Sequence, residues 1–94
     1  MKKLNFEETV RFFDMEGKIV RHFKGNKYLV LGKGENTETG ETMVIYKALY
    51  DTAKIWIRSA KMFLEKVPVG KENPTGQEYR FEKINIESEV QEWK

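Results

Sequence analysis

The chain has 94 residues, the length of a single domain whose small core leaves little room for an enclosed active-site cavity. It contains no cysteine and one histidine, which excludes a disulfide framework and the usual zinc sites. It also lacks a signal peptide and any long apolar run, so we expect a soluble, cytoplasmic protein without a membrane partner. The charges that sum to +2 are unevenly distributed, because residues 17–71 are basic overall and both ends are acidic. This distribution is consistent with an anionic partner, with ends that lie against the body of the domain, or with an ordinary solvated surface.

The N-terminal segment carries the pattern of a short helix. Asn5 and Glu8 have the spacing of a capping box, and Gly17 ends the pattern, which predicts a helix over residues 6–15. Phe12 lies outside the apolar stripe that is expected for this helix. Three residues at helical spacing form that stripe: Phe6, Val10 and Phe13.

Four extended segments follow, and they alternate with turns. Residues 18–31 read as a hairpin with a turn at 24–27, where Gly and Asn both tolerate positive φ. A polar loop at 35–41 leads to a strand at 43–50 that is apolar on both faces. Such a strand must be covered on both faces or bend around a small barrel. Residues 55–58 are expected to pair back on it.

The remaining pattern predicts one helical turn near Met62, with Ser59 as its N-cap, and a turn-rich link before a last extended segment at 79–84. Short strands at this spacing favour a mainly β fold, a small β-barrel. The chain then divides into an N-terminal helical extension (residues 1–16), the barrel (17–86) and an acidic C-terminal tail, helical or frayed (87–94).

His22 is the obvious candidate for catalysis, since it is the only histidine. General acid–base chemistry needs a group that orients the imidazole, and no carboxylate is placed for this by its spacing. Ser59 and Ser88 carry no nucleophile motif. We therefore expect a non-catalytic protein with no cofactor and no metal, and a small enzyme using His22 is kept as an alternative.

Basic and aromatic residues alternate along the predicted strands, as on barrels that bind single-stranded nucleic acids. In so small a chain, Tyr46, Tyr50 and Trp56 are more often core residues. Trp56 and Arg58 share one face of their strand, and two isoleucines share the other. If the isoleucines face inward, Trp56 and Arg58 are exposed together as part of a ligand patch.

The chain carries the motifs R-H-F-K-G (residues 21–25), Y-K-A-L-Y (46–50), W-I-R (56–58) and M-F (62–63). Together these motifs resemble a bacterial domain family of unknown function, number 1653, over about residues 17–84. The resemblance implies an SH3-like β-barrel and carries no established activity. The chain departs from the pattern at Ser59, where proline is expected, and at residues 51–53, which replace a more glycine-like turn. The motif positions are Arg21, His22, Phe23, Lys24, Gly25, Tyr28, Tyr46, Ala48, Leu49, Tyr50, Trp56, Arg58, Met62 and Phe63.

These observations predict a non-catalytic binding module in which basic groups hold an anionic group and aromatic rings pack on it. A nucleic-acid-binding barrel and a structural or oligomeric accessory domain remain alternatives, and the partner is an anionic ligand, a nucleic acid or a protein. The oligomeric state is left open between monomer and homodimer. The candidate ligand-binding residues are Arg21, His22, Lys24, Tyr46, Trp56 and Arg58.

Overall fold

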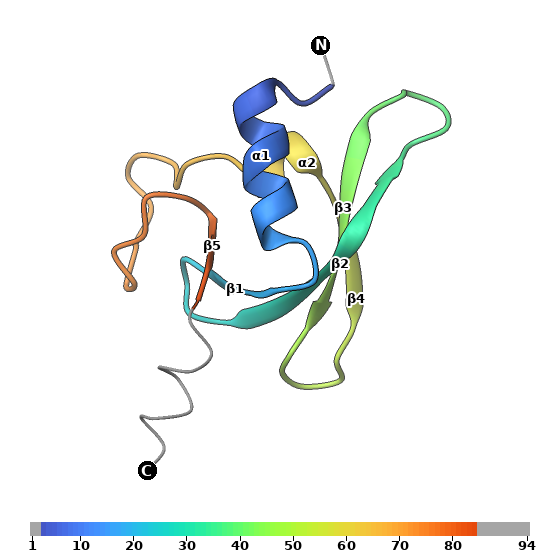
Figure 1. The fold of residues 1–94 in the computed structure, drawn as a ribbon. Helices are drawn as coiled ribbons and strands as arrows, with labels where there is room; N and C mark the ends of the chain where they lie inside the picture. Colours follow the sequence, from blue (N-terminus) through green and yellow to red (C-terminus); the bar gives the residue numbers. More distant parts are fainter. Residues whose placement is uncertain (1–2, 85–94) are drawn as a thin grey trace.

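The computed structural model describes residues 3–84, and the predicted tail at 87–94 lies outside them. A mainly β fold is confirmed: five antiparallel strands form one sheet in the order β4-β3-β2-β1-β5 (Figure 1). The sheet bends strongly but is not closed, because β4 and β5 are its two edges. The elements are α1 (Phe6–Met15), β1 (Ile19–His22), β2 (Lys27–Glu35), β3 (Thr42–Ala48), β4 (Ile55–Ser59), α2 (Ala60–Phe63) and β5 (Phe81–Lys83).

The bounds of α1 follow from its capping box, as predicted. The Asn5 side chain accepts from the backbone N–H of Glu8 at 2.8 Å, and the Glu8 carboxylate accepts from the Asn5 N–H at 2.9 Å. Two backbone donors of the first turn are thereby satisfied. The helical turn at α2 is also confirmed, although the side chain of its N-cap Ser59 makes no capping hydrogen bond.

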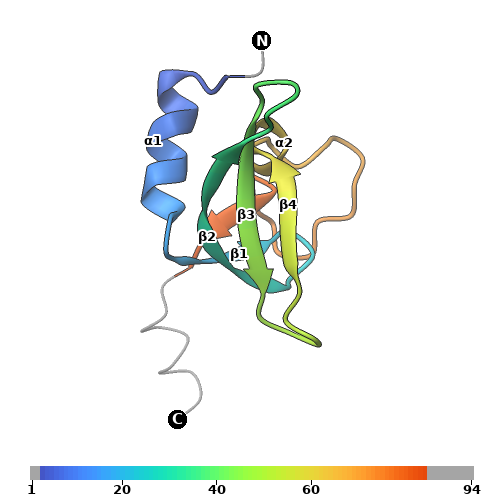
Figure 2. The ribbon, with the colours of Figure 1, turned by 90° about the vertical axis from the view of Figure 1, so that its right-hand side faces the viewer.

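The two faces of the sheet differ in what covers them. The inner face carries the core, and the outer face is its opposite. Pairing places Val44 and Tyr46 of β3 on the inner face, and Ile45 and Ile57 opposite each other on the outer face. A β-bulge between Val30 and Gly32 bends β2, so that the sheet curls around the core. Figure 2 views the outer face, with no helix in front of β3 and β4 and with α2 behind them.

The core joins the inner face to both helices and β5. The rings of Phe63 and Phe81 stack at its centre, 4.0 Å apart between centroids. Tyr46 is 4% exposed and belongs to this core, as the composition favoured, whereas Tyr50 and Trp56 do not. The buried cluster comprises Phe12, Met15, Val20, Tyr28, Val30, Val44, Tyr46, Ala48, Ala60, Phe63, Leu64 and Phe81.

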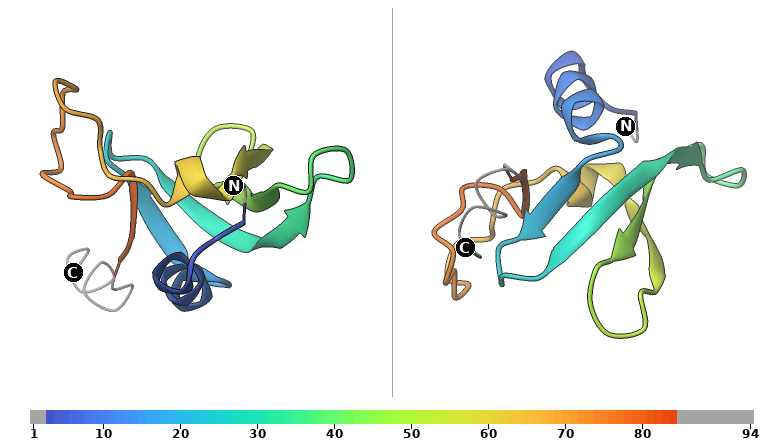
Figure 3. Two further views of the ribbon diagram at one scale, coloured as in Figure 1. Left: turned by 90° about the horizontal axis from the view of Figure 1, so that it is seen from above. Right: turned by 60° about the horizontal axis from the view of Figure 1, so that its bottom comes forward.

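The orientation of α1 differs from the expected one. The predicted stripe faces solvent, and Phe12 and Met15 enter the core instead. Two charged residues flank these buried side chains and are satisfied by distant partners. Glu8 pairs with Lys61 at 2.7 Å, and Arg11 donates to the carbonyl oxygen of Leu64 at 2.7 Å. The buried side of the helix is thus half polar. Figure 3 shows α1 at the outside of the molecule, beside the bent sheet.

The turn between β3 and β4 has non-glycine residues at positions where glycine would be favoured, and this costs conformational energy. Asp51 and Ala53 both adopt positive φ, at 52° and 56°. Alanine in this region costs about 1 kcal/mol, and aspartate tolerates it better. We expect Ala53→Gly to raise the free energy of unfolding by about 0.5–1 kcal/mol, because glycine removes the steric strain. Urea denaturation measures this change, and a lower midpoint for the variant would contradict it.

Candidate functional site

The inner face brings together four of the six predicted site residues. Tyr46 pairs with Trp56 across β3 and β4, so both side chains emerge on this face, and Arg58 is two residues further along. His22 lies at the end of β1 on the same face, because it pairs with the core residue Phe81 of β5. His22, Tyr46, Trp56 and Arg58 therefore share this face. Together with Arg80, whose charge acts on His22, they are called the inner-face cluster.

The other two predicted residues lie apart. Arg21 emerges on the face opposite His22, where its Nε donates to the side chain of Gln77 at 2.8 Å. The Gln77 amide donates in turn to the Arg21 carbonyl at 3.0 Å, so Arg21 anchors the 65–80 loop. Lys24 is exposed in the β1–β2 turn, beside His22 but outside the sheet. The patch expected from six residues is thus divided between two faces and a turn.

Trp56 and Arg58 were expected to be exposed together if the isoleucines of their strand faced inward, and the isoleucines do not face inward. Ile55 and Ile57 face outward, and Trp56 is on the core side of the sheet. Trp56 is nevertheless 44% exposed, and Arg58 is half-buried, because β4 is an edge strand of the sheet. An edge position, rather than an outward orientation, makes this part of the cluster accessible.

The environment of His22 fixes its charge and its tautomer. Burial lowers the pKa of His22 to about 4, assisted by the positive charges of Arg80, Arg58 and Lys24, so the ring is neutral at pH 7. The Lys24 backbone N–H donates to Nδ1 at 3.1 Å, which leaves the proton on Nε2. The ring also lies edge-on to Phe81, 5.0 Å between centroids. His22 is thus a neutral hydrogen-bond donor among cations.

Arg58 and Arg80 are the two arginines whose positive charges act on His22. The Arg58 Nε donates to the Tyr46 hydroxyl at 3.2 Å, and no carboxylate among residues 3–84 pairs with Arg58. Arg80 donates to the Glu65 carboxylate at 2.6 Å. Its buried Nε has no acceptor within the same residues. Sequence reasoning missed Arg80, because it lies 58 positions after His22 and carries no motif of its own.

A small pocket adjoins the cluster at the β3–β4 turn. It has a volume of about 100 Å³ and lies between the half-exposed rings of Tyr50 and Trp56. The Lys54 Nζ is 5.9 Å from the centroid of the Trp56 ring, and the Tyr50 hydroxyl is hydrogen-bonded to that of Tyr28 at 2.8 Å. The pocket therefore offers aromatic walls and one cation next to Arg58.

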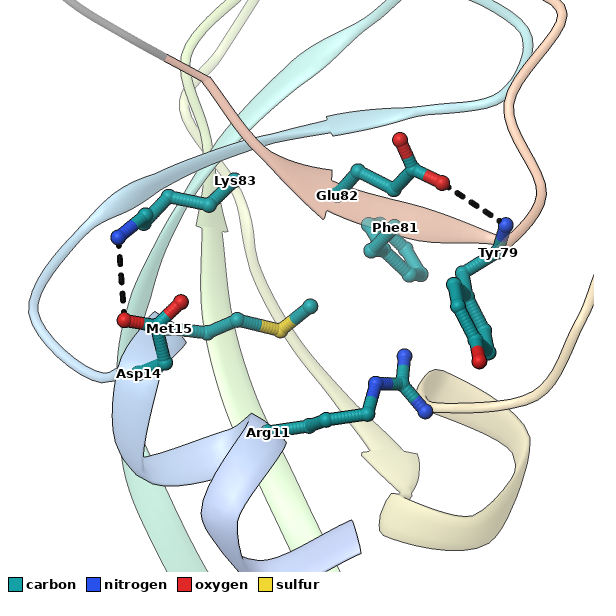
Figure 4. A pocket seen from close by; sticks show the side chains of 7 residues that line it. All are labelled: Arg11, Asp14, Met15, Tyr79, Phe81, Glu82 and Lys83. Atoms are coloured by element: carbon teal, nitrogen blue, oxygen red, sulfur yellow. Dashed lines mark hydrogen bonds and ion pairs between the residues drawn. The ribbon is translucent and has the colours of Figure 1, made fainter. Parts of the chain in front are cut away.

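A second pocket, of about 130 Å³, lies between α1 and β5 (Figure 4). Arg11 extends over the Tyr79 ring at 3.7 Å, and Lys83 pairs with Asp14 at 3.0 Å. The Glu82 carboxylate accepts two backbone N–H groups of the loop. The charged groups around this pocket are thus engaged with one another, which favours a structural role in holding α1 on β5.

The described part of the chain offers no metal site and no membrane-spanning helix. Residues 3–84 contain no group of three or more His, Cys, Asp or Glu side chains that would hold a metal ion. No helix among them has the length and apolar composition that crossing a bilayer requires.

Comparison with known proteins identifies relatives of unknown function. The family model described as protein of unknown function (DUF1653) matches residues 18–83. The crystal structure of a DUF1653 protein from Bordetella bronchiseptica is similar, with 32% sequence identity and a TM-score of 0.62, and the match covers 78% of this chain and 91% of that one. No curated protein matches the sequence.

Proposed function

The chain belongs to the DUF1653 family, whose function is unknown, and we propose that it is a non-catalytic binding module that holds an anionic ligand on the inner face of its sheet. The observation that supports this most is the convergence of donors in the inner-face cluster. Arg58, Arg80 and the neutral His22 contribute donors at one surface, and only one carboxylate, Glu65, pairs with any of them within residues 3–84.

The chemistry of the proposed ligand is inferred from the hydrogen-bond donors and the exposed ring that the inner-face cluster presents. Arg58 commits its Nε to Tyr46, so its two terminal nitrogens can form a bidentate pair with a phosphate or carboxylate. The half-exposed rings of Trp56 and Tyr50 provide a surface for a planar part of the same molecule, at the mouth of a pocket that Asp51 and Lys54 also line. A compact anion attached to a ring fits this arrangement best.

The state of His22 favours binding over catalysis. A general base needs an available lone pair, but Nδ1 already accepts a hydrogen bond and Nε2 carries the proton. A general acid near neutral pH needs a pKa near 7, and this ring has lost its second proton far below that. His22 therefore acts as a fixed N–H donor in the proposed site.

Isothermal titration calorimetry of the full chain tests the proposal with three probes: pyrophosphate, a nucleoside monophosphate and a short single-stranded RNA. We expect saturable binding of the monophosphate. Arg58→Gln should weaken it by about 10- to 100-fold, because a hydrogen bond to a charged group is worth about 1.5–3 kcal/mol. The matched control is Lys71→Gln, which removes the same charge from an exposed loop position and should leave the affinity unchanged.

The probes separate the possible outcomes. Equal losses in both variants would mean that overall charge, rather than the inner-face cluster, attracts the ligand, and the proposal would fail. Binding of RNA alone, with an affinity that falls steeply with salt, would favour the nucleic-acid interpretation instead. Absence of binding by all three probes at low salt would exclude phosphate-bearing ligands of these classes.

A further inference from the structure

Two apolar surfaces on the outside of the molecule are left uncovered by the other residues of the described range, 3–84. The first is a ridge on α1, in which Phe6 is 84% and Phe13 79% exposed, with Val10 between them. The second is the outer face of β3 and β4, where Ile55 and Ile57 are exposed and no helix covers the sheet (Figure 2). Phenylalanines this exposed on a folded helix mark an interaction surface.

The outer face has a groove beside Gly34 of β2, which has no side chain to fill it. Gly34 pairs with Met43 and leaves its position on the outer face empty, so a groove of about 250 Å³ opens there. The groove is mostly apolar. Its lining residues are Gly34, Glu35, Asn36, Met43, Ile45 and Ile57. A ridge and a groove of matching chemistry are therefore present on the same chain.

The charges around the two surfaces are complementary. Glu7 and Asp14 lie next to the ridge on α1, and Glu16 follows at its end. The outer positions of β3 and β4 carry one cation, Lys47, and no acidic residue, although Glu35 of β2 also lines the groove. An acidic amphipathic helix is thus the element that this sheet face accommodates best, and α1 itself has that character.

From these surfaces we infer that the protein forms a two-fold homodimer in which α1 of each copy packs its ridge on the outer face of β3 and β4 of the other. The C-terminal end of α1 lies beside the outer face at β2, because a side-chain carbon at Gly32 would be 3.6 Å from the Glu16 carboxylate. A two-fold arrangement can therefore use both contacts at once and closes on itself.

The size of the contact is sufficient. A covered phenylalanine buries about 150–250 Å². Phe6 and Phe13 of both copies would then supply roughly 500–800 Å² of the about 1,200–2,000 Å² that stable interfaces bury in total. The exposed isoleucines of β4 and the groove contribute the rest. The inference does not depend on the proposed anion site, which lies on the inner face.

Sedimentation velocity on the full chain, from micromolar to submillimolar concentration, tests the dimer. We expect a dimer that dissociates on dilution. Phe13→Lys and Ile57→Lys should each raise the dissociation constant by at least about tenfold, because each buries a charge against an apolar surface. The control is Val69→Lys, at a fully exposed loop position outside both surfaces, and it should change nothing. Circular dichroism checks that all three variants are folded.

Mixing the two interface variants distinguishes this geometry from others. Phe13→Lys keeps an intact sheet face and Ile57→Lys an intact helix ridge, so a heterodimer of the two has one undamaged contact and carries both lysines in the other. Because a second lysine adds little cost to a contact that is already lost, the mixture should form this heterodimer more readily than either variant forms a homodimer, in which both contacts are damaged. A dimer that is lost with Phe13→Lys but kept with Ile57→Lys would indicate helix-on-helix packing and overturn the inference. A monomeric full chain would also overturn the inference. If the dimer formed only after removal of residues 85–94, the tail rather than a second copy would be the partner of these surfaces, and the inference would again be wrong.

Discussion

Phe12→Ala should lower the free energy of unfolding by about 3–5 kcal/mol, a large share of the total stability of a domain of this size. Phe12 is 2% exposed and belongs to the core together with Phe63 and Phe81. Removing its ring leaves a cavity that the surrounding sheet and helix cannot fill. Urea denaturation followed by circular dichroism measures the loss.

The neighbouring residue provides the control. Phe13→Ala removes the same ring from a position that is 79% exposed and should change the stability of the monomer by less than about 0.5 kcal/mol. Both variants are compared at low micromolar concentration, where dimer dissociation adds little to the measured value. Equal losses at the two positions, or a larger loss at Phe13, would contradict the orientation of α1.

Acidification should destabilise the protein between about pH 6.5 and pH 4 through His22. The unfolded chain takes up a proton on this ring near its ordinary pKa of 6.5, whereas the folded chain, with a pKa of about 4, does not. Protons therefore favour the unfolded state as the pH falls through this window, and the stability is fully present above it. The loss is about 2–3 kcal/mol at most, because each unit of difference is worth about 1.4 kcal/mol and the ring is only half-buried.

Comparison with His22→Gln isolates this effect from the carboxylates that titrate in the same range. The variant lacks the ionisable ring, so its stability should fall less steeply from pH 6.5 to pH 4 than that of the unmodified protein. Parallel curves for the two proteins would mean that His22 titrates at its ordinary pKa, and the described environment of the ring would be wrong.

Local sequence signals were sufficient for most of the fold. The capping box of Asn5 and Glu8 located α1, and the turn residues between apolar runs located β1 to β4. The direction in which α1 faces could not be obtained in this way. Periodicity identifies an apolar stripe but not its partner. The true core side includes Glu8, which pairs with Lys61, and Arg11, which donates to Leu64 and lies over the Tyr79 ring.

The candidate site was predictable to a similar extent. Alternation along β4 correctly grouped Trp56 with Arg58, whereas the family resemblance suggested that Arg21 would accompany His22. The sheet separates those two, since neighbouring residues in a strand point to opposite faces. Arg80 enters the site through a loop that Gln77 anchors far along the chain, and no local pattern predicts such a contact.

The proposed anion site is tested most directly by NMR titration of the unmodified protein with the nucleoside monophosphate, followed at the rings of Trp56 and His22. The account predicts that both sets of signals shift together and saturate. It also predicts that the pKa of His22 rises from about 4, because a bound negative charge favours the imidazolium form. Saturable shifts elsewhere in the chain, with both rings and the pKa of His22 unchanged, would contradict it.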